Sequence, residues 1–376
     1  MNKLKLVTIV GTRPEIIRLS SVIKECDKYF DHILIHTGQN YAYELNQIFF
    51  AELNIRKPDH FLEVANDELD LGETMGRIIA ASYKVLAQEK PDALLVLGDT
   101  NSALSVIVAK RLKIPVFHME AGNRCFDQNV PEEINRKLID HISDINLPYT
   151  EHSRRYLIAE GFPGDRILVT GSPMLEVINA YWEKIEQSDV LNKLNLVKGK
   201  YFLVSAHREE NLDIEANFNQ LMSSLNAVAE KYQMPVIYST HPRSQKRIES
   251  SGFKLHKLIK NFKPFGFTDY EKLQMSAFCV LSDSGTITEE ASILNFPAVN
   301  IRNAHERPEG MDMGTMVMSG VGTNRILEAI DMVTKQRIEP VKFKLIHDYE
   351  IDYVSLKVVR IILSYVDFVN RVVWRK

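Results

Sequence analysis

The sequence has few cysteines, no excess of charge of either sign and no long apolar run. Three cysteines among 376 residues, Cys26, Cys125 and Cys279, are widely spaced and odd in number, which argues against a disulfide framework or a zinc cluster. The 46 basic and 49 acidic side chains leave a net charge of −3, so no global field recruits nucleic acid or anionic lipid. We therefore expect a cytoplasmic protein that binds no nucleic acid and holds any anionic ligand with local arginines.

Several signatures are also missing. No apolar run reaches the roughly 18 residues of a membrane helix, and residues 4–10 are too short for a signal peptide and are read as a first strand. The turn after that strand lacks the dinucleotide pattern G-x-G-x-x-G, and no G-x-x-x-x-G-K-[ST] occurs anywhere. These absences argue against a membrane span, a tightly held NAD and a P-loop ATPase.

Apolar strand-like runs alternate with helical patterns along the whole chain, which is typical of a doubly wound parallel sheet. A length of 376 residues favours two domains. We expect an α/β protein with two Rossmann-like domains that face a cleft, at 1–172 and 173–352, and a helix at 353–376 that docks on the N-terminal domain. The expected strands are 4–10, 32–36, 93–97, 116–118, 145–147, 201–205, 236–239, 279–281 and 298–301.

The turn after the first strand reads Gly-Thr-Arg-Pro-Glu and opens a helix. Thr12 and Glu15 have the spacing of a capping box. Free amides at a helix N-terminus attract phosphate, and Arg13 and Arg18 add charge suited to phosphate recognition. A well-capped turn with solvated arginines explains this segment equally well.

Two carboxylates follow neighbouring strands. Asp99 comes after the run 93–97 and Glu120 after 116–118. Consecutive parallel strands place their carboxyl ends along one edge of the sheet, so both side chains should reach the crevice where such folds bind ligands. Asp99 alone could cap a helix, whereas Glu120 leaves a buried strand, where an ionised group needs partners.

A helix start with two further acids comes next, at Pro-Glu-Glu-Ile-Asn-Arg. Glu132 and Glu133 suit the positive end of a helix dipole. Arg136 lies one turn later, where an ion pair with either acid is an ordinary structural explanation.

In the second series His207 and Arg208 follow one strand, and His241 follows another. Histidines are commonly structural, but a position at this edge of a sheet favours a functional role, more for His207 than for His241. No H-E-x-x-H pairing organises these histidines. We expect no metal site.

Ser284, Gly285 and Thr286 follow a later strand and open a helix, presenting amides and hydroxyls suited to a diphosphate. Glu290, one turn on, could accept the two hydroxyls of a ribose. Tyr270 could stack on a base, although a core tyrosine is commoner. An N-cap at Ser284 is the structural alternative for this loop.

Together these motifs resemble the non-hydrolysing UDP-N-acetylglucosamine 2-epimerase family. The matching segments are GTRPE at 11–15, GDT at 98–100, HMEAG at 118–122, PEE-I-NR at 131–136, HRE at 207–209, SDSG-x-x-x-EE at 282–290 and ERPE at 306–309. The resemblance implies two domains of the GT-B type, a UDP-sugar in the cleft, a homodimer, and no metal or nicotinamide. It also implies elimination of UDP to a 2-acetamidoglycal, followed by its re-addition.

Matching by position also implies roles for residues. The catalytic matches are Asp99, Glu120, Glu132 and His207, and which carboxylate removes the proton stays open. Arg18 stands where the family commonly has lysine. The implied substrate and UDP contacts are Arg13, Arg18, Gln39, Arg136, Arg208, His241, Tyr270, Ser284, Gly285, Thr286, Glu290 and Arg307.

Two segments bear on the substrate. EAGNRCFDQ-x-VPEE at 120–133 and ERPEGMD at 306–312 resemble the branch that converts UDP-2-acetamido-2,6-dideoxy-L-talose to UDP-N-acetyl-L-fucosamine for capsule and O-antigen synthesis. Cys125 and Phe126 would suit the methyl of a 6-deoxy sugar. The alternatives are a UDP-N-acetylglucosamine/UDP-N-acetylmannosamine epimerase, a hydrolysing epimerase, a GT-B glycosyltransferase and a silent nucleotide-sugar sensor.

Overall fold

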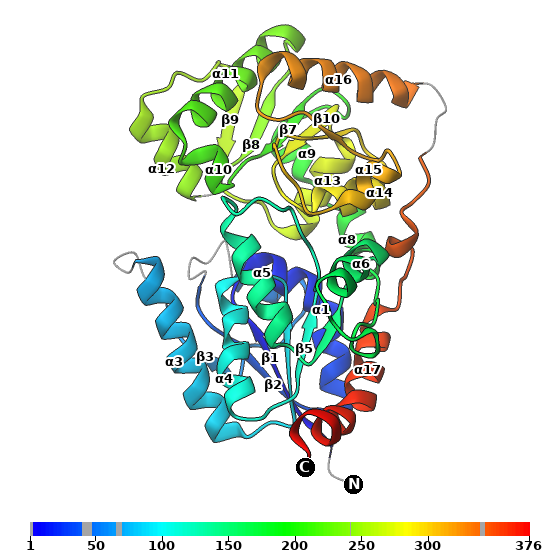
Figure 1. Cartoon of the computed structure of the whole chain (residues 1–376). Helices are drawn as coiled ribbons and strands as arrows, with labels where there is room; N and C mark the ends of the chain where they lie inside the picture. Colours follow the sequence, from blue (N-terminus) through cyan, green and yellow to red (C-terminus); the bar gives the residue numbers. More distant parts are fainter. Residues whose placement is uncertain (1–2, 40–46, 65–69, 241, 339–342) are drawn as a thin grey trace. The chain divides into compact units, whose positions relative to one another are not determined.

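The computed structural model describes residues 3–39, 47–64, 70–240, 242–338 and 343–376 (Figure 1). The chain divides into two compact units. Unit 1 comprises Met1–Ala180 and His347–Lys376, and unit 2 comprises Tyr181–Ile346. Unit 2 is therefore inserted, in sequence, between two parts of unit 1.

Unit 1 is built on a six-stranded sheet in the order β3-β2-β1-β4-β5-β6, with every neighbouring pair parallel. The central strands are buried on both faces, which explains why their sequences are near-continuous runs of valine, isoleucine and leucine. The strands are β1 Lys5–Val10, β2 Asp31–His36, β3 His60–Phe61, β4 Ala93–Leu97, β5 Val116–Met119 and β6 Ile145–Leu147.

Helices cover both faces of this sheet (Figure 1). The predicted capping box is confirmed, because Thr12 and Glu15 bond reciprocally at the start of α1. The helices are α1 Arg13–Tyr29, α2 Gln47–Glu52, α3 Leu71–Glu89, α4 Val106–Arg111, α5 Pro131–Ile142, α6 Glu151–Ala159, α7 Met174–Ala180 and α17 Val354–Val369, with short turns at Asn101–Ser105, Gly164–Arg166, His347–Tyr349 and Asn370–Trp374.

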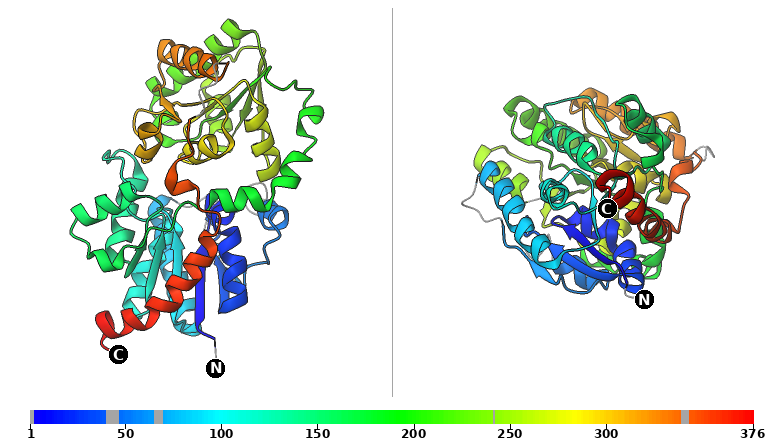
Figure 2. Two further views of the ribbon diagram at one scale, coloured as in Figure 1. Left: turned by 90° about the vertical axis from the view of Figure 1, so that its right-hand side faces the viewer. Right: turned by 60° about the horizontal axis from the view of Figure 1, so that its bottom comes forward.

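Helix α17 returns the chain to unit 1 and packs along α1 (Figure 2). Its apolar stripe, which includes Val358, Ile362 and Val366, is buried. Glu176 of α7 accepts hydrogen bonds from both the backbone amide and the hydroxyl of Ser355. The last segment is thus an integral part of unit 1.

Unit 2 repeats the plan with a six-stranded parallel sheet in the order β12-β11-β10-β7-β8-β9. Its strands are β7 Phe202–Ser205, β8 Val236–Ser239, β9 Ile259–Phe262, β10 Cys279–Ser282, β11 Ala298–Asn300 and β12 Val317–Met318. Its helices are α8 Trp182–Glu186, α9 Val190–Lys193, α10 Glu209–Leu212, α11 Glu215–Tyr232, α12 Pro242–Ser251, α13 Phe267–Ser276, α14 Ile287–Leu294, α15 Pro308–Asp312 and α16 Thr323–Ile338.

Counted within its unit, each sheet has the doubly wound strand order 3-2-1-4-5-6, so the prediction of two Rossmann-like parallel sheets is confirmed. In such sheets ligands bind where the strand order reverses, outside the carboxyl ends. That point lies between β1 and β4 in unit 1 and between β7 and β10 in unit 2. Among the residues described, no helix has the length and apolar character needed to cross a membrane.

Candidate active site

Glu15 holds the turn between β1 and α1 together. Its Oε2 accepts from the amides of Gly11 (3.0 Å) and Thr12 (2.7 Å) and from the Thr12 hydroxyl (2.8 Å). Its Oε1 accepts from the hydroxyl of Thr100, which lies in the turn after β4 (2.9 Å). Glu15 therefore ties together the two turns that flank the reversal of strand order. Complete burial raises the pKa of Glu15 to about 7, although the four hydrogen bonds that it accepts act to lower it.

Glu120 stands in a sharp turn immediately after β5. Its φ of 62° is left-handed, an uncommon conformation for a residue with a side chain. The carboxylate forms an ion pair with Arg18 of α1 and accepts from Asn123 Nδ2 at 3.3 Å. A Cβ built on Gly98 would lie 3.7 Å from Glu120 Oε2. The carboxylate thus lies over the turn that carries Asp99, as the sequence predicted.

Two residues of helix α5 bind the turn that carries Asp99. The guanidinium of Arg136 pairs with Asp99 Oδ2 through both Nη2 (2.7 Å) and Nε (3.0 Å). Asn135 donates to the carbonyl oxygen of Asp99 at 3.1 Å. The Asp99 side chain consequently faces an arginine. Thr100 stands at the N-cap position of the helical turn that follows β4, without a side-chain capping bond.

Glu133 organises the segment between β5 and α5. It is fully buried and accepts from the amides of Cys125 (3.1 Å) and Phe126 (3.3 Å) as well as from Arg136 (3.0 Å). The expected helical ion pair with Arg136 is confirmed, but Glu133 does more than complement a helix dipole. Glu132, its neighbour in sequence, is half-buried.

Gln39 and Arg13 complete this edge of unit 1. Gln39 Oε1 accepts from the amide of Ser102 (3.2 Å) and from its hydroxyl (3.0 Å). Arg13 is half-buried, with its guanidinium carbon 5.9 Å from the ring centre of Phe49. Unit 1 therefore gathers Arg13, Arg18, Gln39, Asp99, Glu120 and Arg136 around the carboxyl ends of β1, β4 and β5.

In unit 2 a buried aspartate shapes the loop after β7. Asp283 accepts from the amides of His207 (2.9 Å) and Arg208 (3.0 Å) and from Asn211 Nδ2 (3.0 Å). His207 Nδ1 lies 3.3 Å from Asp283. This arrangement fixes His207 at the carboxyl end of β7, beside the loop after β10.

The loop after β10 carries small polar groups. The hydroxyl of Ser284 accepts from the amide of Thr286 at 3.3 Å and lies 3.0 Å from its hydroxyl. Thr286 stands at the N-cap position of α14 with helical dihedrals and makes no side-chain capping bond, whereas the bond from its amide to Ser284 is the kind that a capping serine makes. The structure therefore supports the structural alternative of a cap at Ser284. A Cβ on Gly285 would lie 2.5 Å from Glu306 Oε1, hence this position admits no larger side chain without rearrangement.

Glu290 is hydrogen-bonded to a residue of α13. Gln274 Nε2 donates to Glu290 Oε2 at 2.7 Å, and Glu271 is buried nearby. Burial and the neighbouring Glu290 carboxylate raise the pKa of Glu271. Tyr270, on the same helix, is half-buried and packs at the margin of the apolar cluster that contains Leu273.

Buried arginines support the loop after β11. Arg302 Nη1 binds Glu306 at 2.9 Å, and its Nε lies 3.3 Å from Glu210. Arg307 Nη2 lies 3.4 Å from Glu289 of α14. Arg208 Nη2 lies 3.4 Å from Glu306, so the loops after β7 and β11 share this cluster.

Sequence reasoning missed the buried acids that hold these turns. They are Glu15 as a link between turns, Glu133, Asp283, and Asp140 of α5, which accepts from the amide of Gly122 at 3.1 Å. For Glu15 and Glu133 the signal was weak, because an acid near a helix start is usually explained by capping. Asp140 lies near the end of α5 and Asp283 directly after β10, where the sequence pattern gave no signal. His241 lies outside the described residues. No group of three or more histidine, cysteine, aspartate or glutamate side chains within the described ranges is arranged to hold a metal ion.

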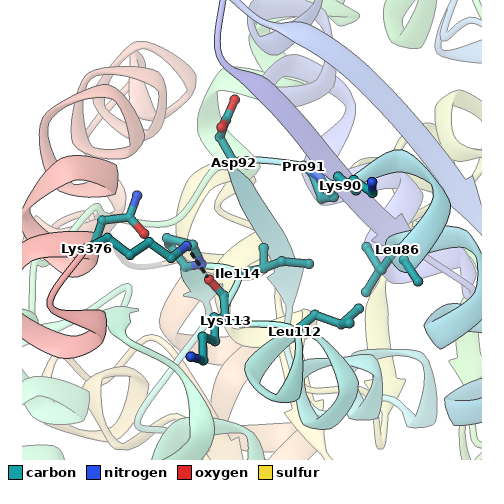
Figure 3. A pocket seen from close by; sticks show the side chains of 11 residues that line it. Leu86, Lys90, Pro91, Asp92, Leu112, Lys113, Ile114 and Lys376 are labelled. Carbon is teal, nitrogen blue, oxygen red and sulfur yellow. Dashed lines mark hydrogen bonds between the residues drawn. The ribbon is translucent and has the colours of Figure 1, made fainter.

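A cavity of about 360 Å³ lies elsewhere in unit 1 (Figure 3). Lys90, Pro91 and Asp92 line it just before β4, and Leu112 and Ile114 just before β5. It therefore belongs to the amino-terminal edge of the sheet, opposite the edge that carries Asp99 and Glu120.

Both units are doubly wound parallel sheets of the GT-B type, with acids paired to arginines at the carboxyl edge of unit 1 and a hydroxyl-rich loop at that of unit 2. A fold of this kind hosts many activities, so the class of enzyme is taken from the family match. The chain belongs to the non-hydrolysing UDP-N-acetylglucosamine 2-epimerase family, whose model, described as UDP-N-acetylglucosamine 2-epimerase, matches residues 24–363. The resemblance inferred from the motifs is thereby confirmed at the level of the family, and the protein is an isomerase.

Two solved structures and one further relative are similar to this chain over most of its length. The structure of UDP-N-acetylglucosamine 2-epimerase from Rickettsia bellii is 55% identical, with a TM-score of 0.91 and 100% of each chain covered. The UDP-GlcNAc 2-epimerase of Methanocaldococcus jannaschii in complex with UDP-GlcNAc and UDP is 35% identical, with a TM-score of 0.89, covering 96% of this chain and 100% of that one. UDP-2,3-diacetamido-2,3-dideoxy-D-glucuronate 2-epimerase of Pseudomonas aeruginosa is 32% identical over 87% of this chain and 91% of its own length.

Proposed function

We propose that this protein inverts C2 of a UDP-linked 2-acetamido sugar by eliminating UDP and adding it back. The observation that carries the proposal is the pair Asp99 and Glu120 on adjacent strand ends, each against an arginine of a neighbouring helix. Ligands of such folds bind where the strand order reverses. Two carboxylates beside that point can therefore remove and return a proton at the same carbon of a bound substrate. Family membership supplies the reaction for which that pair is suited.

In the proposed reaction a carboxylate removes the C2 proton, and the C2–H electron pair forms the C1=C2 double bond as the C1–O bond to UDP breaks. The leaving oxygen takes the electron pair of that bond. A proton then reaches C2 from the opposite face while UDP adds back at C1, so no oxidant or hydride is consumed. Asp99, Glu120 and Glu132 are the proposed acid and base groups, and His207 is a further proposed catalytic residue.

We assign UDP binding to the strand ends of unit 2. The amides and hydroxyls of Ser284, Gly285 and Thr286 suit the diphosphate, and Glu290 suits the ribose hydroxyls. We propose Tyr270 as the base-stacking side chain. The remaining substrate contacts that we propose are Arg13, Arg18, Gln39, Arg136, Arg208, His241 and Arg307.

For the sugar we propose UDP-2-acetamido-2,6-dideoxy-L-talose, which would yield UDP-N-acetyl-L-fucosamine. Support comes from the resemblance of the 120–133 and 306–312 segments to that branch. In the first of these segments Glu133 fixes the backbone of Cys125 and Phe126, while the Cys125 thiol donates to Glu133 at 3.3 Å and the Phe126 ring packs against Tyr156. The names of the relatives show that members of this family act on more than one UDP-sugar. UDP-N-acetylglucosamine is the alternative substrate.

On the same resemblance we propose a cytoplasmic homodimer that supplies a precursor for capsule or O-antigen synthesis. A glycosyltransferase would instead need an acceptor before it released UDP, and a hydrolysing epimerase would release UDP irreversibly without one.

Proton NMR in deuterated water tests the function and the sugar together. The protein is incubated in parallel with UDP-2-acetamido-2,6-dideoxy-L-talose and with UDP-N-acetylglucosamine. Deuterium at C2 of a new epimer identifies the reaction, and the faster substrate identifies the sugar. If neither sugar exchanges at C2 and no free UDP appears, the proposed function is wrong.

A further inference from the structure

A fully buried charged network lies directly beneath the Glu120 turn. Asp140, on α5, is its centre: both carboxylate oxygens accept from the amide of Gly122 (3.2 and 3.1 Å), and Oδ2 accepts from Arg124 Nη1 at 2.7 Å. His118 Nδ1 lies 2.9 Å from Oδ1. The side chains of His118, Arg124 and Asp140 are all 0% exposed.

The network reaches the second carboxylate turn as well. His118 Nε2 lies 2.8 Å from the carbonyl oxygen of Gly98, which can only accept, so Nε2 donates. Gly98 immediately precedes Asp99, and Gly122 follows Glu120 by two residues. Asp140 thus contacts the backbone of the Glu120 turn directly, at Gly122. It lies next to the backbone of the Asp99 turn through His118, at Gly98.

This contact bears on the strained part of the turn. A non-glycine residue with a φ near 60° costs of order 1–3 kcal/mol and persists only where its surroundings hold it. Glu120 is anchored on one side by its amide, which donates to Leu147 O at 3.1 Å, and on the other by the bond from Gly122 to Asp140. Removing the second anchor releases one side of the turn, so that Arg18 and Asn123 hold the carboxylate on a less rigid backbone.

We propose that Asp140 is a positioning residue, which sets the left-handed conformation of Glu120 and thereby the place of its carboxylate. The proposal rests on the proposed function, in which Glu120 moves a proton at C2. Asp140 touches no reacting atom in this scheme, so its effect must pass through the Glu120 turn.

Asp144 offers a matched control in the same part of the fold. It is a buried aspartate that follows α5, accepts from the amide of Val116 at 3.0 Å and forms an ion pair with Lys110. Val116 is the first residue of the strand that ends beside Glu120. Both aspartates therefore secure β5, but Asp144 does so at the opposite end from the turn.

The test compares Asp140→Asn with Asp144→Asn. The side-chain amide of asparagine has the shape of the Asp140 carboxylate but only one acceptor oxygen. Its NH2 group takes the place of the second oxygen and cannot accept from Gly122. For Asp140→Asn we expect kcat to fall about tenfold to a hundredfold through misplacement of the proton-transfer group, with KM and the calorimetric affinity for UDP within about twofold. For Asp144→Asn we expect a lower melting temperature but a kcat within about twofold of the wild type.

His118→Gln is the second variant, in case Asp140→Asn yields no folded protein, and should lower kcat with KM unchanged. Equal losses of kcat in the Asp140 and Asp144 variants, or an unchanged kcat in both Asp140→Asn and His118→Gln, would overturn the proposal. Wild-type protein is assayed first for C2 exchange: its inactivity would count against the proposed function, whereas an active wild type isolates the role of Asp140.

Discussion

Units 1 and 2 share one strand order but differ in how buried acids are used at the carboxyl edge. In unit 1 acids face arginines at that edge, as Asp99 does with Arg136 and Glu120 with Arg18. In unit 2 Asp283 instead accepts from the amides of His207 and Arg208. The acid–arginine pairs of unit 2, such as Glu306 with Arg302, lie at the loop after β11. The Ser284 loop beside them offers amides and hydroxyls, the groups that we propose for the diphosphate.

We propose that this difference assigns proton transfer to the paired acids of unit 1 and anion binding to the Ser284 loop of unit 2. A carboxylate paired with a cation at a strand end can exchange a proton with a substrate, whereas a loop of amides and hydroxyls can only hold an anion. We therefore expect changes at Asp99 or Glu120 to act mainly on kcat, and changes in the Ser284 loop to act mainly on the affinity for UDP.

The largest effect that we expect is for Glu120→Gln in unit 1. The amide cannot transfer the C2 proton, so kcat should fall by about a thousandfold or more, while the affinity for UDP stays within about tenfold. Deuterium incorporation at C2 and titration calorimetry with UDP measure the two quantities. Glu160→Gln, which alters only the outer partner of Arg124, is the control. Undiminished turnover in Glu120→Gln would remove this residue from the mechanism.

A second expected effect concerns the stability of unit 1. Burial raises the pKa of Glu15 to about 7 from 4.5, so the folded state holds this proton more tightly than the unfolded state. The stabilisation is fully present below pH 4.5 and is lost as the pH rises through 7. Glu15→Gln does not titrate and keeps the capping-box geometry, hence it should gain stability over the wild type as the pH rises, by up to about 3 kcal/mol.

The two tryptophans make this measurable for unit 1 alone. Trp374 belongs to unit 1 and Trp182 to unit 2, so in a Trp182→Phe background fluorescence follows unit 1 during urea unfolding. The difference in unfolding free energy between the Glu15→Gln variant and its parent should grow as the pH rises from 4.5 to about 8. A difference that is independent of pH would show that Glu15 stays ionised throughout.

The smallest effect expected is for Ser284→Ala in unit 2. Loss of one hydroxyl, which accepts from the amide of Thr286 at 3.3 Å, should weaken UDP binding about threefold to tenfold. The value of kcat at saturating substrate should not change, and Ser250→Ala on the exposed face of α12 serves as the control. A fall in kcat with unchanged UDP affinity would contradict the assignment of the Ser284 loop to UDP binding.

Patterns of period and spacing predicted the two sheets, because strands buried on both faces leave uninterrupted apolar runs in the sequence. They did not predict β3, β9 or β12, which are short or polar, as in Ile-Lys-Asn-Phe of β9. Edge strands need few apolar residues, so composition does not distinguish them from loops.

The candidate site was predictable only in part. Strand-end positions identified Asp99, Glu120, His207 and Ser284, since a parallel sheet aligns its carboxyl ends. The supporting acids were not predictable, because Asp140 reaches Gly122 from 18 residues away, and no local pattern records such a bond. Placement of a helix against a strand end, which only the folded chain defines, decides which acids become partners.

The insertion of unit 2 within unit 1 has a consequence for the order in which the chain is made. Helix α1 ends at Tyr29, but α17, which packs along it, begins only at Val354, so the whole of unit 2 is synthesised between them. At roughly 5–20 residues per second on the ribosome, α1 exposes apolar surface for tens of seconds before its partner exists. Unit 2 is continuous in sequence and can fold meanwhile, so the second unit along the chain is the first that can be completed.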